Sequence, residues 1–211
     1  MKVTSIYILI IFLSYIAIAK NNNIKNVKNK IENSGISIDK VEAKSAFDYL
    51  NEIRKNPRLF NIELGVDLSY VPTKDKLIWN DTLARVAENK AKDMASKEYF
   101  NHIDPAGFGM NIKINDAGYK LEPAFYSKKS LNYFESLSAG SIDGRDCIKQ
   151  LILDISLEPD INKGHRNHLL GIDYDNSNFR SSAKDIGIGF CKAKNRKYSS
   201  YISIIIAKHS F

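Results

Sequence analysis

The sequence predicts one α+β domain with an antiparallel sheet, and three observations lead to this class. Amphipathic helical patterns come first, within residues 43–56 and 81–97. Two apolar strand patterns, residues 185–191 and 201–207, come last and lie close enough in sequence to form a hairpin. Helices followed by paired strands are typical of layered α+β domains. A chain of 211 residues is long enough for one such domain and too short for two large ones.

Residues 1–19 have the pattern of a secretory signal peptide. Lys2 supplies a short positive segment, residues 6–16 are almost wholly apolar, and Ala17 and Ala19 are the small residues that signal peptidase reads. We expect cleavage after Ala19 and a secreted protein in an extracellular, periplasmic or cell-surface location. An uncleaved membrane anchor is the alternative, although the apolar run is short for spanning a bilayer.

Residues 20–42 are rich in Asn and Lys and show no sustained hydrophobic period. We therefore expect a flexible leader there and the folded domain over residues 43–211. The formal net charge is +7, but the lysines are scattered among acidic residues instead of clustered with aromatic ones. This distribution argues against a nucleic-acid partner, and we expect a monomeric domain with a basic, solvated surface.

The chain has two cysteines, Cys147 and Cys191. In an oxidising compartment they could pair, and the chain-entropy treatment of such a crosslink gives a stabilisation of roughly 3 to 4 kcal/mol. Two buried free thiols are the alternative, because the sequence does not define the distance between them.

The first two helices are predicted from their apolar faces. The first begins near Ala43 and stops at Asn56, which precedes a proline. The second is expected to be capped by Asp81 or Thr82 and to end near Lys97. The apolar face of the second helix is formed by Leu83, Val86, Ala87, Ala91 and Met94, and the aliphatic stem of Lys90 can lie along it.

The second half of the chain predicts shorter elements. Residues 109–117 indicate a short helix, and residues 119–125 indicate an irregular strand interrupted by Pro123. Residues 133–140 alternate like a strand, and residues 146–157 predict a third helix before the break at Pro159. The final hairpin should connect through residues 195–197.

Two stretches have side chains suited to metal binding or proton transfer. Asp154 and His165 are separated by a polar loop, and an imidazole facing a carboxylate on a neighbouring helix suits either chemistry. His102 lies near a helix end, where a histidine is either a hydrogen-bonded structural residue or a ligand. Glu135 lies in an apolar strand pattern, so it either turns to solvent or is held by a cationic partner.

Six segments together resemble the CAP superfamily, the SCP-like domain of cysteine-rich secretory, venom-allergen, plant pathogenesis-related and many bacterial exported proteins. They follow the family order across roughly residues 43–208: LNEIRKNP, LIWNDTLARVAENKAKDMA, YFNHIDPAG, FESLSAG, GHRNHLL and DIGIGF. The resemblance implies a three-layer α-β-α sandwich with a central antiparallel sheet and a cleft on one face.

The resemblance also implies that two histidines and two acidic residues meet in this cleft. By motif, the first three are His102, Glu135 and His165. The second acid is Asp154, the best match on the preceding helix, or its rival Glu158.

The neighbours of these residues depart from the family in part. The family commonly has Gly-Glu-Asn where this chain has Phe134, Glu135 and Ser136, which changes the surroundings of the carboxylate. Ser136 and Arg166 are the further residues expected beside the site. His168 and His209 are expected to be bystanders.

Two neutral imidazoles, with carboxylates that orient their N–H groups, suit an exchangeable Zn²⁺ or another divalent cation. The alternative is that these pairs only tie helices to the sheet. No serine shows a nucleophile-elbow pattern and neither cysteine lies in a histidine motif, so covalent catalysis has no evident nucleophile.

Family members are mostly binding or effector modules, some of which bind lipid or sterol. The leading hypothesis is an exported CAP-domain binding module with a metal-capable cleft, whose partner is a lipid, a sterol, or an envelope or host protein. The alternative is a metal-dependent hydrolase, a protease or esterase, that uses the same cleft.

Overall fold

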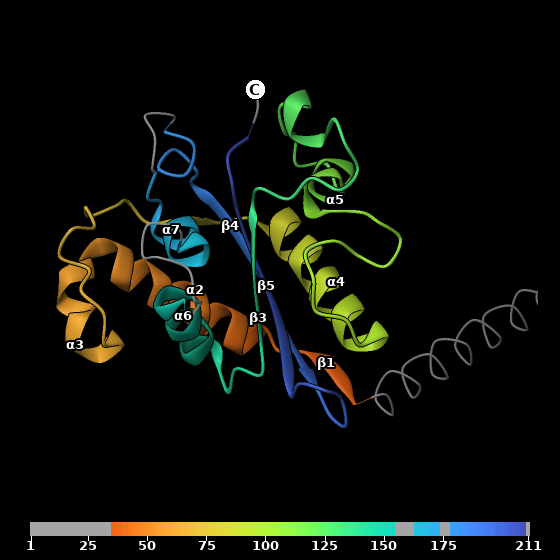
Figure 1. The fold of residues 1–211 in the computed structure, drawn as a ribbon, viewed down its shortest axis with the longest axis horizontal. Coiled ribbons are helices and arrows are strands. Elements are labelled where there is room, and N and C mark those ends of the chain that lie inside the picture. The colour runs from red at the N-terminus through yellow and green to blue at the C-terminus, as the bar shows by residue number, and fades with distance from the viewer. Residues whose placement is uncertain (1–34, 155–162, 174–177, 210–211) are drawn as a thin grey trace, which may run out of the picture.

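The computed structural model describes residues 35–154, 163–173 and 178–209. They form an α+β domain in which a central sheet lies between two layers of helices (Figure 1). The helices are α2 (Lys40–Lys55), α3 (Asn61–Leu64), α4 (Asp81–Lys97), α5 (Met110–Asp116), α6 (Gly144–Leu153) and α7 (Gly164–Leu170), with short 3-10 helices at Pro57–Phe60 and Pro123–Tyr126. The strands are β1 (Ile36–Ile38), β2 (Ile78–Trp79), β3 (Glu135–Ala139), β4 (Asp185–Ala193) and β5 (Ser200–Ala207). The predicted α+β fold class and three-layer arrangement are confirmed.

The sheet has the strand order β1-β4-β5-β3, with every neighbouring pair antiparallel. The predicted hairpin is β4–β5, in which Ile188 lies opposite Ile204. β2 adds a short parallel pairing at the start of β4, where Ile78 lies opposite Asp185. β3 therefore lies at the edge of this sheet, and its first residue is Glu135.

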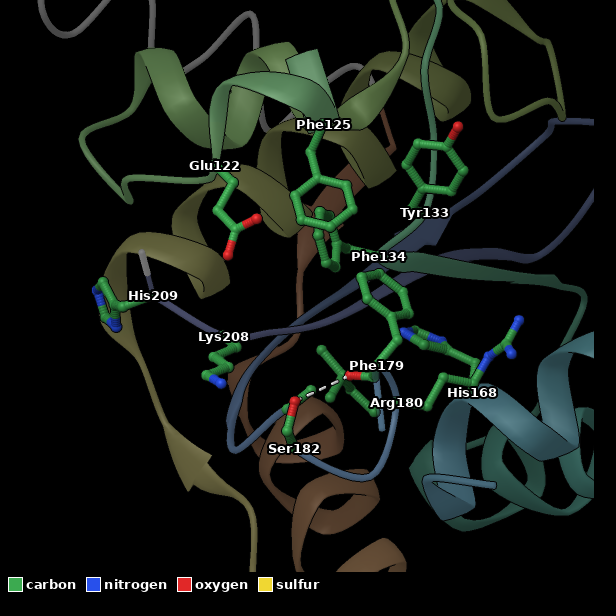
Figure 2. Close-up of a pocket in the computed structure, with 12 residues that line it drawn as sticks. Glu122, Phe125, Tyr133, Phe134, His168, Phe179, Arg180, Ser182, Lys208 and His209 are labelled. Carbon is green, nitrogen blue, oxygen red and sulfur yellow. Dashed lines mark hydrogen bonds between the residues drawn. The ribbon is translucent and has the colours of Figure 1, made fainter. Parts of the chain in front are cut away.

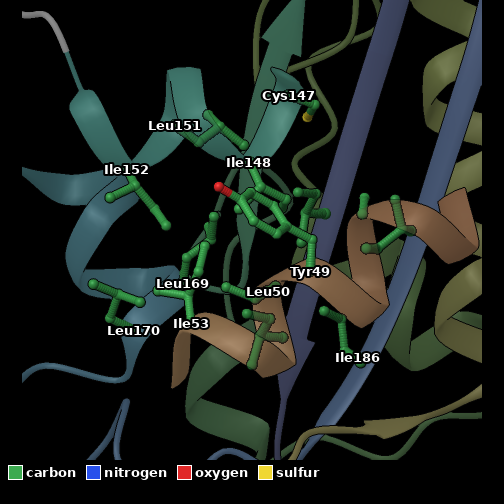
Figure 3. Close-up of a cluster of buried hydrophobic side chains, with 14 of the residues drawn as sticks. Tyr49, Leu50, Ile53, Cys147, Ile148, Leu151, Ile152, Leu169, Leu170 and Ile186 are labelled. Carbon is green, nitrogen blue, oxygen red and sulfur yellow. The ribbon is translucent and has the colours of Figure 1, made fainter. Parts of the chain in front are cut away.

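The two faces of β5 contribute to different parts of the core. Ile202, Ile204 and Ile206 belong to the cluster formed with α2, α6 and α7. Figure 3 shows side chains of these three helices in that cluster, among them Leu50, Ile148 and Leu169. Ile205 and Ala207 pack instead with α4 and α5 on the other face. Because helices cover both faces, this strand is apolar along nearly its whole length.

α4 packs very close to β4. A Cβ atom on Gly187 would lie 2.1 Å from the Ala84 nitrogen, and one on Gly189 would lie 2.3 Å from the Ala87 carbonyl carbon. The two glycines of the DIGIGF segment therefore allow the helix backbone to approach the strand backbone directly.

The folded domain begins earlier than predicted. β1 pairs with β4, and Asp39 caps α2 by accepting hydrogen bonds from the Val41 and Glu42 main chains. The predicted boundary at residue 43 therefore falls inside α2. Residues 1–34 lie outside the described ranges, so the signal peptide and most of the leader stay predictions. Within the described ranges, no helix is long and apolar enough to cross a membrane.

Three predicted element boundaries or types are wrong. Asn80, rather than Asp81 or Thr82, caps α4, because its side chain accepts from the Thr82 and Leu83 main chains. α6 ends at Leu153 and not at residue 157, because the next residue adopts a left-handed conformation. Residues 119–125 form no strand, since Pro123 begins a 3-10 helix.

The two cysteines are free, so the disulfide alternative is not realised. Cys147 belongs to the core between α2 and α6, whereas Cys191 faces α4 across the sheet. Burial raises the pKa of the Cys147 thiol to about 12 and that of Cys191 to about 11. Both are unreactive structural residues.

Candidate functional site

His102 and Glu135 form the first half of the candidate site. The imidazole Nδ1 lies 3.0 Å from Glu135 Oε2, and the ring is 40% exposed while the carboxylate side chain is 0% exposed. Ser203 on β5 donates a hydrogen bond of 2.7 Å to the other carboxylate oxygen. A buried carboxylate is costly without such partners, so Glu135 is held in one orientation and in turn orients the imidazole.

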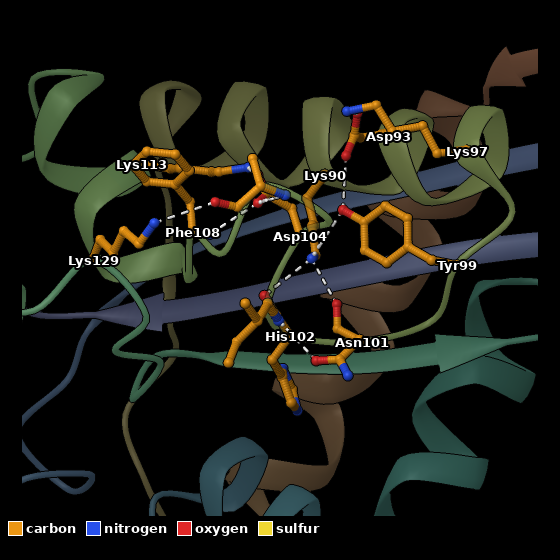
Figure 4. A network of polar contacts seen from close by, with 12 residues as sticks. Lys90, Asp93, Lys97, Tyr99, Asn101, His102, Asp104, Phe108, Lys113 and Lys129 are labelled. Carbon is orange, nitrogen blue, oxygen red and sulfur yellow. Dashed lines mark hydrogen bonds and ion pairs between the residues drawn. The ribbon is translucent and has the colours of Figure 1, made fainter.

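Lys90 on α4 fixes the loop that carries His102 (Figure 4). Its ammonium group donates to the main-chain oxygens of Asn101 at 2.7 Å and His102 at 3.0 Å, and it contacts the Tyr99 hydroxyl at 3.3 Å. Burial lowers the pKa of Lys90, and the nearby Glu135 carboxylate opposes this shift. The sequence predicted the position of the Lys90 stem but not the role of its charge.

Asp104 anchors the far end of the same loop. It accepts hydrogen bonds from the Ala106 and Phe108 main chains, each 2.9 Å long, and pairs with Lys113 on α5. Burial raises the pKa of Asp104, but Lys113 and the two main-chain donors lower it by more, to about 2. His102 therefore lies in a loop that is fixed at both ends.

Asp154 and His165 form the second half of the candidate site. Asp154 Oδ1 lies 3.2 Å from the His165 Nδ1, and Oδ2 accepts a 3.0 Å hydrogen bond from the His165 main chain. The ring is 37% exposed and the Asp154 side chain is 9% exposed. The left-handed backbone of Asp154, with φ of 43°, ends α6 and places its carboxylate at the start of α7.

Arg166 holds the end of α6 in place. Its guanidinium donates to the main-chain oxygens of Ile152 at 2.6 Å and Leu153 at 3.1 Å. These are terminal carbonyl groups of the helix that precede Asp154 directly. Arg166 therefore positions the acid through the backbone.

The two halves are joined through β3 and α7. Ser136 follows Glu135 on β3. Its hydroxyl oxygen lies 2.7 Å from Nδ1 of His168 on α7. Burial lowers the pKa of His168 to about 3 against an opposing contribution from the Ile206 main chain, and the charges of Arg180, His165 and His102 lower it further. Both candidate imidazoles are thus within electrostatic range of His168.

One protein family matches the part of the chain that contains these residues. The sequence matches the Cysteine-rich secretory protein family, CAP, over residues 47–206, which include His102, Glu135 and His165. The chain belongs to the CAP family. No protein of curated function matches this CAP domain.

Proteins from three organisms are among the solved structures that are similar to this CAP domain. An outer surface protein from Borrelia burgdorferi has a TM-score of 0.50 and 16% identity, covering 80% of this chain and 94% of that one. An extracellular protein containing a SCP domain from Bacillus anthracis has a TM-score of 0.44 and 20% identity, covering 80% and 41%. The venom allergen-like protein 4 of Schistosoma mansoni has a TM-score of 0.43 and 13% identity, covering 81% and 90%. At these identities the similarity concerns the fold alone.

The geometry of this CAP domain leaves the same ring nitrogen available in both pairs. When Nδ1–H donates to a carboxylate, Nε2 carries the lone pair that can bind a metal ion. Within the described residues, no group of three or more His, Cys, Asp or Glu side chains is arranged to hold a metal. The described residues therefore form two separate histidine–carboxylate pairs, each with one ring nitrogen left over.

The site residues predicted from sequence have different outcomes in the structure. His102 pairs with Glu135, and His165 pairs with Asp154. Glu158 lies outside the described residues. Ser136 contacts His168 and not the Glu135 carboxylate, because neighbouring strand residues point to opposite faces.

Ser203 was not among the residues predicted from the sequence, and His168 and His209, which were expected to be bystanders, both have specific partners in the structure. Ser203 is a polar residue in a strand that is otherwise buried on both faces, which is a signal that it has a specific partner. His168 bridges to β3, and His209 pairs with Asp185 at 2.9 Å. His209 thus forms a third histidine–carboxylate pair, at the end of the described chain.

Proposed function

We propose that this CAP domain is an exported binding module whose cleft holds an exchangeable divalent cation between His102 and His165. One observation carries this proposal: each imidazole has its Nδ1 engaged by a largely buried carboxylate, while the ring itself is more than a third exposed. Histidine ligands of metal ions typically have this arrangement. The bound ion would supply a Lewis-acidic centre to which a partner's oxygen group can attach.

Two protein nitrogens make a weak site by themselves. Zn²⁺ commonly takes four ligands, so water or a partner would supply the remaining positions. Such a site exchanges its ion with the surroundings and becomes complete when a partner contributes a ligand. This fits a binding module better than a structural metal centre.

An extracellular role is supported by two observations of different kinds. The family that the chain belongs to is the Cysteine-rich secretory protein family. Residues 1–19 have the charge and hydropathy pattern of a signal peptide. We infer that the domain acts at the cell envelope or outside the cell.

The loop around His102 supports an apolar partner, either a lipid or a protein. Phe100, Ile103 and Phe108 are 44%, 40% and 37% exposed in this loop. Neighbouring exposed apolar side chains next to a polar site favour an interaction surface. A partner could thus bury this loop while one of its oxygen atoms approaches the imidazoles.

The test is a calorimetric titration of the mature protein with Zn²⁺. We expect one saturable event in the wild type, and a loss of at least about tenfold in affinity in both His102→Ala and His165→Ala. His209→Ala is the matched control, because His209 makes the same type of pair with Asp185. Unchanged binding in the first two variants, or an equal loss in the control, would contradict the proposal.

The hydrolase alternative has less support from the geometry. Ser136 contacts a histidine, but it is 1% exposed and faces α7, so a substrate cannot reach it. A metal-activated water is the remaining route. Peptide or ester hydrolysis that disappears with a chelator and in His102→Ala would establish that route in place of simple binding.

A further inference from the structure

A small polar cavity lies where the end of α2 meets the segments that precede β2 and β4. Its volume is about 190 Å³, which is below the usual range for drug-sized ligands. One arginine, three lysines and one aspartate line it: Arg54, Lys74, Lys76, Lys184 and Asp75. A cavity of this size and composition suits a small ion or a single terminal group.

Main-chain hydrogen bonds fix the walls of this cavity. The Lys74 main chain donates to the Arg54 main-chain oxygen at 2.9 Å, and the Ile78 main chain donates to that of Lys184 at 2.7 Å. The segment of residues 73–78 is thereby tied to α2 on one side and to the start of β4 on the other. The lining side chains thus project from a backbone that the fold itself holds in place.

Arg54 is the buried charge of the cavity. Only 3% of the residue is exposed, and the guanidinium makes no ion pair with another described residue. Its Nη1 donates to the Leu169 main-chain oxygen at 2.8 Å. Its Nε is buried without a hydrogen-bond partner, and the described residues give Nη2 no partner either. A buried charged donor that is left unsatisfied is costly, which favours an acceptor from outside the chain.

The end of α7 determines which edge of the guanidinium remains available. Nη1 is engaged by Leu169, and Gly171 lies so close that an added Cβ would be 3.2 Å from Nη1. Nε and Nη2 together form the opposite edge. Such an edge can donate two parallel hydrogen bonds to the oxygens of one oxyanion.

The charges around Arg54 are mainly positive. Lys74, Lys76 and Lys184 line the cavity, and none of them makes an ion pair with another described residue. Asp75 also lines it and acts on Arg54 electrostatically, without a hydrogen bond. Burial lowers the pKa of Arg54 to about 10, so Asp75 offsets only part of the cost of burying this charge. Four cations therefore face one carboxylate.

Two carboxylates that are close to the lining residues in sequence are held by other groups. Asp173 accepts hydrogen bonds from the main chains of Arg180 and Ser181, at 2.7 and 3.1 Å. Asp185 accepts one of 2.8 Å from the Tyr119 hydroxyl. Neither aspartate lines the cavity, so neither supplies a counter-ion inside it.

We propose that this cavity binds a phosphate group. Two phosphate oxygens accept hydrogen bonds from Nε and Nη2 of Arg54, and Lys74 and Lys184 pair with the others. A dianion offsets more of the positive charge than a carboxylate does, and a tetrahedral group can contact several cations at once. The small volume favours free phosphate over a phosphate attached to a lipid. The site shares no residue with the proposed cation site.

The test is NMR of the Arg54 Nε–H resonance during addition of sodium phosphate, with sodium chloride used to keep the ionic strength constant. We expect a saturable shift, because phosphate gives this N–H group an acceptor. Acetate is the matched probe with a single charge, and it should bind at least about tenfold more weakly. Phosphatidylcholine vesicles that contain phosphatidic acid present the phosphate group on a lipid. Vesicle binding that free phosphate displaces would overturn the choice of free phosphate.

Matched variants connect the binding to the named residues. Arg54→Lys keeps the charge but removes the edge with two donors, and the double variant Lys74→Ala/Lys184→Ala removes two lining charges. Both should weaken phosphate binding by at least about tenfold. The double variant Lys120→Ala/Lys128→Ala removes the same number of charges at exposed positions that do not line the cavity. It should bind phosphate like the wild type.

Thermal melts show which variants are folded under the conditions of the titration. If Arg54→Lys does not fold, the wild-type Nε–H shift and the two lysine double variants decide the question. Absence of a saturable shift on addition of phosphate would overturn the proposal. It would also be overturned by equal affinity for acetate, or by equal phosphate affinity in the two lysine double variants.

Discussion

Lys90 belongs to the α4 face that packs on the sheet, and only 2% of its surface is exposed. Its ammonium group replaces water as the donor to two loop carbonyl groups, those of Asn101 and His102. A long side chain on an apolar helix face would ordinarily carry its charge out to solvent. Here the charge remains inside the protein because the loop folds over it.

We predict that Lys90→Met destabilises the protein by roughly 1 to 3 kcal/mol, because the partly buried main-chain oxygens of Asn101 and His102 lose a charged donor. The loop should also become less ordered, so Zn²⁺ affinity should fall although no proposed ligand is changed. Lys97→Met is the control on the same helix. The Lys97 side chain pairs with Asp93 but is 55% exposed, so its loss should change the stability little. Urea unfolding and the zinc titration measure both effects. Equal unfolding midpoints for the two variants would contradict the assigned role.

His168 makes the stability depend on pH. Burial lowers its pKa to about 3, from the ordinary value of 6.5 that applies in the unfolded chain. Between these values the unfolded chain binds a proton that the folded chain excludes. The stability that neutral His168 contributes is therefore fully present above about pH 6.5 and is lost as the pH falls toward 3, where this residue alone raises the unfolding constant by up to about tenfold per pH unit.

Urea titrations of the wild type and His168→Gln across this range measure that contribution. Glutamine does not titrate, so the variant should lose less stability on acidification than the wild type. The other histidines are present in both proteins and cancel in the comparison. Parallel losses of stability in the two proteins would show that His168 is not the residue responsible.

Among the elements, α4 and β4 approach each other closely at two glycines. Gly187 and Gly189 lie where any side chain would overlap the α4 backbone. α2 and α6 meet in a similar way at Gly144, where an added Cβ would lie 2.1 Å from the Glu42 main-chain oxygen. The layers of this domain are thus positioned by backbone contact as well as by side-chain packing.

We predict that Gly189→Ala costs roughly 3 kcal/mol or more, because α4 has to move away from the sheet. Gly164→Ala is the matched control, since an added Cβ there meets no atom within 4 Å and alanine favours the helix that it begins. Thermal or urea unfolding distinguishes the two variants. Equal stability of Gly189→Ala and the control would contradict the close approach of α4 to β4.

The types of most elements were predictable because their patterns are long and locally determined. α2, α4, β4 and β5 each show a clear period or a continuous apolar run. β1 was missed because three residues with alternating burial give little periodic signal. The early end of α6 was missed because a left-handed aspartate was not expected from the apolar pattern, which continues to residue 157.

At the scale of the whole molecule, the candidate site combines segments that are far apart in sequence. His102 and Glu135 belong to a loop and the edge strand, whereas Asp154 and His165 lie at the junction of α6 and α7. Motif resemblance predicted the identity of these four residues. It did not predict Ser203, which binds the Glu135 carboxylate, because that contact depends on the register of β3 against β5.

The cavity of about 280 Å³ beside the end of β5, which is lined by Phe125, Phe134, His168 and Phe179 among others, illustrates the same limit (Figure 2). Its aromatic and basic side chains come from the segment before β3, from α7, and from both sides of the β4–β5 hairpin. No local pattern connects these segments. Only the packing of α7 against β3 and β5 brings His168 next to Phe134 and Phe179.

The most direct test of the proposed cation site is NMR of the imidazole nitrogens during addition of Zn²⁺. We predict that the Nε2 resonances of His102 and His165 change together with one binding constant, while their Nδ1 groups stay hydrogen-bonded to Glu135 and Asp154. His209 should not respond in the same concentration range. A response at only one of the two histidines, or none at either, would contradict the proposed site.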